Sequence, residues 1–133
     1  MNEYEHDNID LNDNSFSKKE RLHHQKIIEE LFKDGSSTFL YPFLLKYLPL
    51  QETEQERFHQ LLISVPKKHI RRAPDRNLVK RRIREIYRTN KRLVYPSSVK
   101  YYLAVVYVGK EVAKFDFMRN KLIKVLKRLP ISK

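Results

Sequence analysis

The sequence predicts an α/β domain of two layers, and three observations support this prediction. The chain has 133 residues, which is about the length of one domain. Runs of strand-type residues alternate with segments whose apolar residues recur at the spacing of one helix face. A strongly basic segment of helical period separates two of the strand-like runs. The resulting order of helix, strands, helix, strand and helix is typical of helices packed against a sheet.

The first helix is predicted from Lys18 to Asp34. Ser17 and Glu20 have the spacing of a capping box, in which each side chain binds the free backbone N–H of the other residue. Gly35 is expected to adopt the left-handed conformation that ends a helix. The apolar stripe is short, so the helix needs a sheet to pack on. It consists of Ile27, Ile28, Leu31 and Phe32.

The strands are predicted from runs of β-branched and aromatic residues. Phe39 to Leu48 contains Pro42, which cannot donate to a central ladder, so this run is either an edge strand or two short strands broken at Pro42. Gln51 to Glu56 is predicted to be a polar loop. Phe58 to Val65 and Tyr101 to Val108 have the composition of buried strands.

Two further helices are predicted. One begins at Asp75, the expected N-cap, and at about 100° per residue its cations fall on one face while Val79, Ile83 and Ile86 fall on the opposite one. The other, Asp116 to Leu129, has an apolar stripe of ordinary core spacing. The polar residues that share the exposed face of the basic helix are Arg76, Asn77, Lys80, Arg81, Arg84 and Arg88.

Composition excludes several classes of protein. Cysteine is absent, which excludes disulfides, thiolate nucleophiles and Cys-ligated zinc. No apolar run approaches the roughly 18 residues of a membrane span. The N-terminal residues are acidic, whereas a signal peptide is first basic and then apolar. We therefore expect a soluble, cytoplasmic protein without a membrane partner.

The charge is strongly basic and unevenly distributed. Lys and Arg number 28 against 16 Asp and Glu, a net charge of +12. Met1 to Asn14 holds five acidic and no basic residues, whereas Pro66 to Arg92 holds twelve basic and two acidic ones. This balance favours a polyanionic partner, nucleic acid first. We predict a disordered acidic tail over residues 1–15 and a folded domain over residues 16–133.

The basic helix has the residue types that bind phosphate. Guanidinium groups bind phosphate oxygens bidentately and lysines add point charge, and Lys67, Lys68, Arg71 and Arg72 precede the helix. The alternatives are a solvated charged face, which usually mixes signs, and a helix that lies on anionic lipid or serves as a calmodulin-type target. The lipid and calmodulin alternatives need a wide exposed apolar face, whereas a sheet is available to cover this one.

Other side chains offer less specific signals. Phe32, Phe43 and Tyr47 can stack unpaired bases beside the basic helix, although aromatic residues at such positions are more often core. No histidine has a paired acid at a recognisable spacing, and no P-loop, GxSxG or HExxH motif occurs. We therefore assign no catalytic residue and no metal ligand to this chain.

The stretch from Ser64 to Glu85 resembles the signature of the bacterial ribonuclease P protein subunit, a pattern of SVxKK, a short turn and RNxxKRxxRE. The resemblance extends over about Phe16 to Leu129. It implies a two-layer α/β sandwich of order αβββαβα, with a mixed sheet and a left-handed βαβ crossover that carries the basic helix. General topology rules alone predict a right-handed crossover. The matching positions are Ser64, Val65, Lys67, Lys68, Arg76, Asn77, Lys80, Arg81, Arg84 and Glu85.

The resemblance also implies a function. The family's partner is a catalytic RNA that removes the 5′ leader of precursor tRNA, and Mg²⁺ bound by that RNA supports the hydrolysis. The resemblance thus implies that this chain is a subunit of an endoribonuclease, with no DNA partner expected, that docks on the RNA and holds the leader. The implied leader cleft, between the first helix and the sheet, contains Phe32, Phe43 and, subject to a one-residue offset in that strand, Tyr47. The implied RNA contacts are Arg76, Asn77, Lys80, Arg81 and Arg84, with Lys67, Lys68, Arg71 and Arg72 beside them. Arg88, on the same face of the basic helix, is also predicted to bind RNA.

Two other functions remain open from the sequence. A basic RNA-binding protein of the ribosomal kind would share the charge and would not promote leader cleavage. An autonomous nuclease would cut RNA in the absence of a catalytic RNA and would depend on a carboxylate or histidine of this chain.

Overall fold

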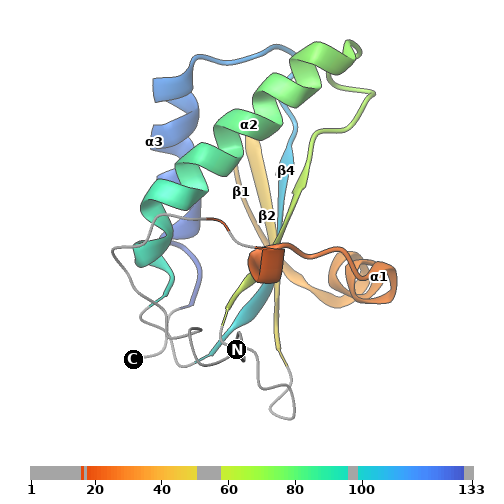
Figure 1. The fold of residues 1–133 in the computed structure, drawn as a ribbon, viewed down its shortest axis with the longest axis vertical. Helices are drawn as coiled ribbons and strands as arrows, with labels where there is room; N and C mark the ends of the chain where they lie inside the picture. The colour runs from red at the N-terminus through yellow and green to blue at the C-terminus, as the bar shows by residue number, and fades with distance from the viewer. Residues whose placement is uncertain (1–15, 17, 51–57, 96–98, 131–133) are drawn as a thin grey trace, which may run out of the picture.

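Four strands form one mixed sheet, in the order β1-β2-β4-β3. The computed structural model describes residues 16, 18–50, 58–95 and 99–130 (Figure 1). The predicted acidic tail and the predicted loop Gln51 to Glu56 lie outside these residues. No helix in the described ranges is both long and apolar enough to span a membrane. The elements are η2 (Lys18–Glu20), α1 (Gln25–Asp34), β1 (Ser36–Leu40), β2 (Phe43–Pro49), β3 (Gln60–Ser64), α2 (Ala73–Asn90), η3 (Lys91–Leu93), β4 (Tyr101–Tyr107) and α3 (Phe115–Leu126).

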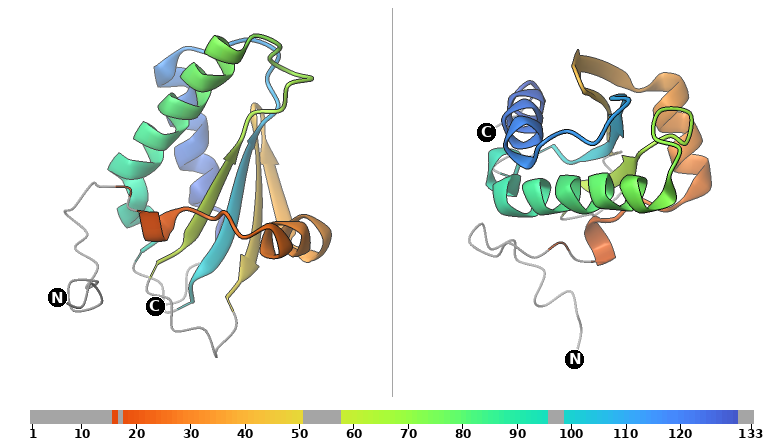
Figure 2. Two further views of the ribbon diagram at one scale, coloured as in Figure 1. Left: turned by 45° about the vertical axis from the view of Figure 1, so that its right-hand side comes forward. Right: turned by 90° about the horizontal axis from the view of Figure 1, so that it is seen from above.

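The order of elements and the mixed sheet agree with the predicted fold. β1 and β2 are antiparallel, as are β2 and β4, whereas β3 and β4 are parallel neighbours. The basic helix α2 connects the two parallel strands. In the left view of Figure 2 the parallel strands run upward, β4 lies to the right of β3, and the segment from η2 to α1 crosses in front of them. The viewer therefore faces the α1 side of the sheet, and α2 packs on the opposite side. This arrangement is the left-handed crossover that the family resemblance implied.

The two faces of the sheet have different coverings. Along β4, Tyr101, Leu103 and Val105 belong to the large core beneath α2 and α3. The alternate residues Tyr102 and Ala104 belong to a smaller cluster beneath α1. Because successive side chains of a strand point to opposite faces, this alternation assigns each sheet residue to the α2/α3 face or to the α1 face.

The first helix is shorter than predicted. η2 is one turn of 3₁₀ helix, and α1 begins only at Gln25. The intervening backbone pairs with the sheet, since the N–H of Leu22 donates to the carbonyl of Leu61 at 2.9 Å. Glu20 is buried and bound to residues far along the chain. The sequence pattern over residues 18–24 was helical, but the lysine contact holds Glu20 in a single 3₁₀ turn and the contact with the sheet keeps residues 21–24 out of a helix.

Gly35 ends α1 without a left-handed conformation. Its φ is −70° and its ψ is 150°, so that prediction is wrong. Its N–H donates to the carbonyl of Leu31, and a Cβ at this position would lie 2.4 Å from that oxygen. Close approach of the two backbones, not a special φ, is therefore the reason for glycine.

Pro42 divides the first strand region into two. β1 and β2 form a hairpin whose turn contains Pro42 after a cis peptide bond with Tyr41. This is the second of the two predicted alternatives. Near the C-terminus, α3 begins one residue before and ends three residues before the predicted bounds. Leu129 is still buried in the core, in the turn that follows the helix.

Candidate nucleic-acid interface

α2 begins two residues before the predicted start. Arg72 occupies the N-cap position, and Pro74 lies in the first turn, where a missing N–H costs nothing. Asp75 was predicted to be the N-cap, and this prediction is wrong, because Asp75 lies in the first turn of the helix. Its carboxylate lies 3.8 Å from the guanidinium of Arg72 and near the positive end of the helix dipole.

The two faces of α2 differ as the sequence predicted. Val79, Ile83 and Ile86 are each 0 % exposed and pack against the sheet and α3. Arg81 and Arg84 are exposed on the outer side of the helix. Because the apolar face is completely covered, it is not available to lipid or to a calmodulin-type partner, and only the basic face meets solvent. Of the predicted RNA-binding residues on this helix, Asn77, Arg81 and Arg84 are exposed, and Arg76, Lys80 and Arg88 are partly exposed.

The loop before α2 brings more cations to the start of the helix. The N–H groups of His69 and Ile70 both donate to the carbonyl of Pro66, which folds the loop into a tight turn. Ile70 is buried and anchors this turn in the core. The predicted residues of the loop are all exposed: Lys67, Lys68, Arg71 and Arg72.

Arg76 joins this loop to the helix. Its Nη1 donates to the carbonyls of Ile70 at 3.0 Å and of Arg71 at 2.6 Å. Arg76 therefore holds the cations of the loop beside those of the helix. Its guanidinium fixes the conformation of the loop and also adds positive charge to the surface.

Arg88 differs from the other cations of the helix. Its guanidinium donates to both carboxylate oxygens of Glu85, at 2.6 and 3.0 Å. This hydrogen bonding lowers the pKa of Glu85 and raises the pKa of Arg88. The pair is close to neutral, so Arg88 contributes less positive field than Arg81 or Arg84.

The three predicted cleft aromatics do not lie together. Phe32 is exposed on α1. Phe43 is 0 % exposed and packs edge to face against Tyr107 in the core beneath α2 and α3. Tyr47 is partly exposed and packs against Tyr101 on that same face. The prediction of Phe43 as a cleft residue is wrong, because a fully buried ring has no surface for a base, and Tyr47 lies on the opposite face of the sheet from α1.

The sheet face beside α1 presents other residues, which the sequence prediction missed. In β2, Leu44 and Lys46 alternate with the buried Phe43 and Leu45, so they point toward α1. In β1, Phe39 pairs with Leu44 and is 53 % exposed. Period-two alternation in Phe43 to Leu48 was the only signal for these residues. It could not indicate which set faces α1, because both sets contain large side chains.

The sequence of this chain is similar to those of known proteins. The sequence model of the family described as Ribonuclease P matches residues 16–130. The ribonuclease P protein component of Porphyromonas gingivalis is 33 % identical over 124 residues, which cover 87 % of this chain and 90 % of the relative. That of Petrotoga mobilis is 31 % identical over 121 residues, which cover 86 % of this chain and 95 % of the relative.

Two solved protein structures have the same fold as this chain. The ribonuclease P protein from Thermotoga maritima superposes with a TM-score of 0.69 at 28 % identity, covering 84 % of this chain and 98 % of that one. The Staphylococcus aureus ribonuclease P protein has the same fold, with a TM-score of 0.69 at 24 % identity, covering 86 % of this chain and 98 % of the other.

Proposed function

Because this chain belongs to the ribonuclease P protein family, we propose that it is the protein subunit of ribonuclease P and binds the RNA subunit through α2 and the preceding loop. The single observation that carries the proposal is the division of α2 into a fully buried apolar face and an exposed basic face. A face of this kind suits a folded polyanion, since fixed guanidinium groups grip phosphates without a conformational change.

We assign the leader of precursor tRNA to the sheet face beside α1. The support is chemical: Phe32 and Phe39 are exposed rings on which unpaired bases can stack, and Lys46 adds a cation to the same face. Phe32 remains from the predicted cleft, whereas Lys46 takes the place of Tyr47. This is the one-residue offset that the sequence left open in β2.

In this proposal the hydrolysis belongs to the RNA subunit, and Mg²⁺ held by that RNA supplies the metal-ion chemistry. The protein binds and orients: the α2 surface neutralises phosphates of the RNA subunit, and the α1 face holds the leader. Within the described part of the chain, no three His, Cys, Asp or Glu side chains are grouped to hold a metal ion. We place the complex in the cytoplasm.

The test is reconstitution of the full chain with a bacterial ribonuclease P RNA and precursor tRNA at low Mg²⁺. We expect leader cleavage that depends on the protein. RNA binding without any stimulation of cleavage would reject the proposal in favour of a basic RNA-binding protein of the ribosomal kind. Cleavage by the protein without the RNA subunit would reject it in favour of an autonomous nuclease.

A further inference from the structure

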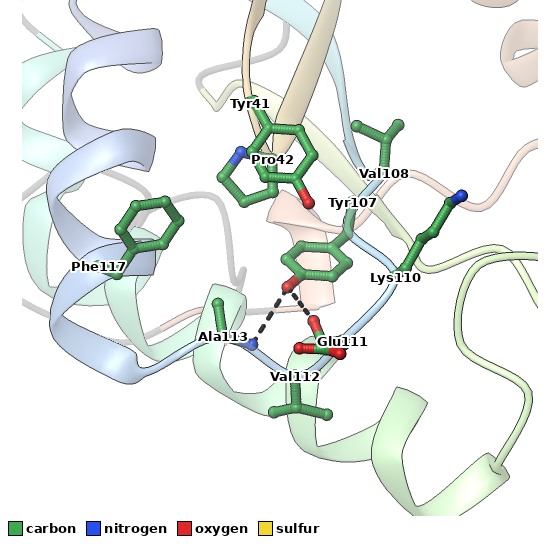
Figure 3. A pocket seen from close by; sticks show the side chains of 9 residues that line it. All are labelled: Tyr41, Pro42, Tyr107, Val108, Lys110, Glu111, Val112, Ala113 and Phe117. Carbon is green, nitrogen blue, oxygen red and sulfur yellow. Dashed lines mark hydrogen bonds between the residues drawn. The ribbon is translucent and has the colours of Figure 1, made fainter.

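A pocket lies on the side of the molecule where α3 meets the β1–β2 turn. Its volume is about 320 Å³. Figure 3 shows Phe117 approaching it from the first turn of α3, Tyr41 and Pro42 from the hairpin turn, and Tyr107 from the end of β4. The pocket is separate from the exposed face of α2 and from the α1 face of the sheet.

The base of this pocket is preformed by the loop that follows β4. The hydroxyl of Tyr107 donates to the carbonyl of Glu111 at 2.5 Å and accepts from the N–H of Ala113 at 3.2 Å (Figure 3). A Cβ at Gly109 would lie 2.7 Å from that hydroxyl, so the loop closes tightly around the ring. The same loop is also tied to α2, because Nη1 of Arg82 donates to the carbonyl of Ala113 at 2.6 Å. A fixed loop favours binding because little ordering is required of it.

Two walls of the pocket are exposed aromatic rings. Tyr41 is 53 % exposed and Phe117 is 41 % exposed. Exposed aromatic rings are the usual platforms for unpaired bases, since every base has a π face. The volume is at the lower end of the roughly 300 to 1,000 Å³ that is typical of small-molecule pockets. It therefore suits one planar ring better than an extended peptide.

The positive charge beside the pocket favours a polyanionic ligand. Residues 108–130 contain seven basic and two acidic residues. Phe117, Lys121 and Lys124 have i, i+4, i+7 spacing and so share one face of α3. Nζ of Lys121 lies 5.5 Å from the centre of the Phe117 ring. A row of cations thus begins at the aromatic wall and runs along the helix.

The row ends at the outer edge of the sheet. Arg128 donates to Oγ1 of Thr38 at 3.2 Å and to the carbonyl of Phe39 at 2.8 Å, on β1. Of the two acidic residues, Asp116 lies 3.9 Å from Arg119, and Glu111 lies at the pocket rim. A carboxylate at the rim repels a phosphate but accepts hydrogen bonds from the amino group of a base.

We propose that this pocket takes one unpaired nucleobase of an RNA strand whose phosphates lie along Lys121 and Lys124 of α3. The inference goes beyond the proposed function, because it adds a third RNA-binding surface, on the α3 side of the molecule, to those on α2 and beside α1. Base stacking on Tyr41 and Phe117 supplies the specificity for an unpaired nucleotide, and the helix cations supply sequence-independent affinity.

The test follows the ring NMR signals of Tyr41 and Phe117 in the full chain during titration with a short single-stranded oligoadenylate RNA. The matched probe is an abasic oligonucleotide of the same length, which has the phosphates without the bases. We expect both rings to shift with oligoadenylate and to move much less with the abasic probe. Equal shifts with the two probes, or no shift with either, would overturn the proposal.

Variants separate stacking from charge. Tyr41→Ala should weaken oligoadenylate binding at this site roughly 5- to 150-fold, with little effect on binding of the abasic probe. The ring signals of Phe117 report this binding in the variant. The double variant Lys121→Gln and Lys124→Gln should weaken both probes, whereas Arg119→Gln, on another side of α3, should weaken neither. An unchanged affinity in Tyr41→Ala would also overturn the proposal. Protein-dependent leader cleavage is measured separately, so this inference and the proposed function fail independently.

Discussion

Glu20 and Lys91 form a buried ion pair that joins the start of the described chain to the end of the basic helix. Nζ of Lys91 lies 3.3 Å from Oε1 of Glu20, and both side chains are at most 5 % exposed. The hydroxyl of Tyr95 donates to the same oxygen at 2.9 Å. The pair therefore ties η2 to η3 across 71 residues and fixes the end of α2 relative to the sheet.

Breaking this pair should destabilise the protein strongly. Lys91→Met leaves a buried carboxylate without its cation, and we expect a loss of about 3–5 kcal/mol in the free energy of unfolding, measured by urea denaturation. Replacing both residues, with Glu20→Leu and Lys91→Met, should cost less than Lys91→Met alone. Arg72→Ala is the control, because it removes an exposed pair and should cost about 0–1 kcal/mol. Equal losses in Lys91→Met and Arg72→Ala would contradict this role.

His59 should make stability depend on pH. Its Nε2 donates to the carbonyl of Val94 at 2.6 Å, and its Nδ1 accepts from the N–H of Tyr101 at 2.9 Å, so the ring is held neutral. Burial lowers its pKa from 6.5 to about 4. The unfolded chain therefore takes up the proton first as the pH falls. The contribution of His59 to the free energy of unfolding is therefore fully present above about pH 6.5. It is lost as the pH falls toward 4, and the loss is at most about 3 kcal/mol.

The measurement is urea denaturation between pH 7.5 and 4.5 for the wild type and for His59→Gln. The variant should be less stable at neutral pH and should show a flatter profile between pH 6.5 and 5. An NMR titration of the folded wild type supplies a second readout. A His59 ring that titrates near its ordinary pKa in the folded state would refute the prediction.

Arg81→Ala and Arg84→Ala should weaken binding to ribonuclease P RNA while they change the free energy of unfolding by less than about 0.5 kcal/mol, since both side chains are exposed. Each lost phosphate contact should reduce the slope of log affinity against log salt by about 1. Filter binding at several salt concentrations measures this slope. Arg119→Ala removes the same charge from α3 and should leave the slope nearly unchanged. A wild-type affinity that does not respond to salt would contradict phosphate binding altogether.

Phe32 and Phe43 should respond in opposite ways to replacement by alanine. Phe43→Ala empties a fully buried site and should cost about 3–5 kcal/mol of stability. Phe32→Ala should leave stability nearly unchanged, because the ring is already exposed, and should raise KM for precursor tRNA with a leader. Binding of mature tRNA, which has no leader, is the matched control. A Phe32→Ala variant with an unchanged KM would remove this ring from the leader site.

The basic helix was predictable from the sequence because its face assignment is local. Helix geometry fixes the angle between residues such as Arg81 and Ile83 wherever the helix packs, so composition and spacing were enough to separate the two sides of α2. The motif around Ser64 to Glu85 likewise indicated the family and, with it, the left-handed crossover.

Tertiary structure alone decided the rest. A strand has two faces, and a shift of one residue exchanges them; the packing of Phe43 against Tyr107 determines that Lys46, and not Tyr47, points toward α1. Glu20 had the spacing of a helix cap, yet its partner lies 71 residues away. Contacts of this length depend on how the whole chain folds, whereas the period of a single helix does not.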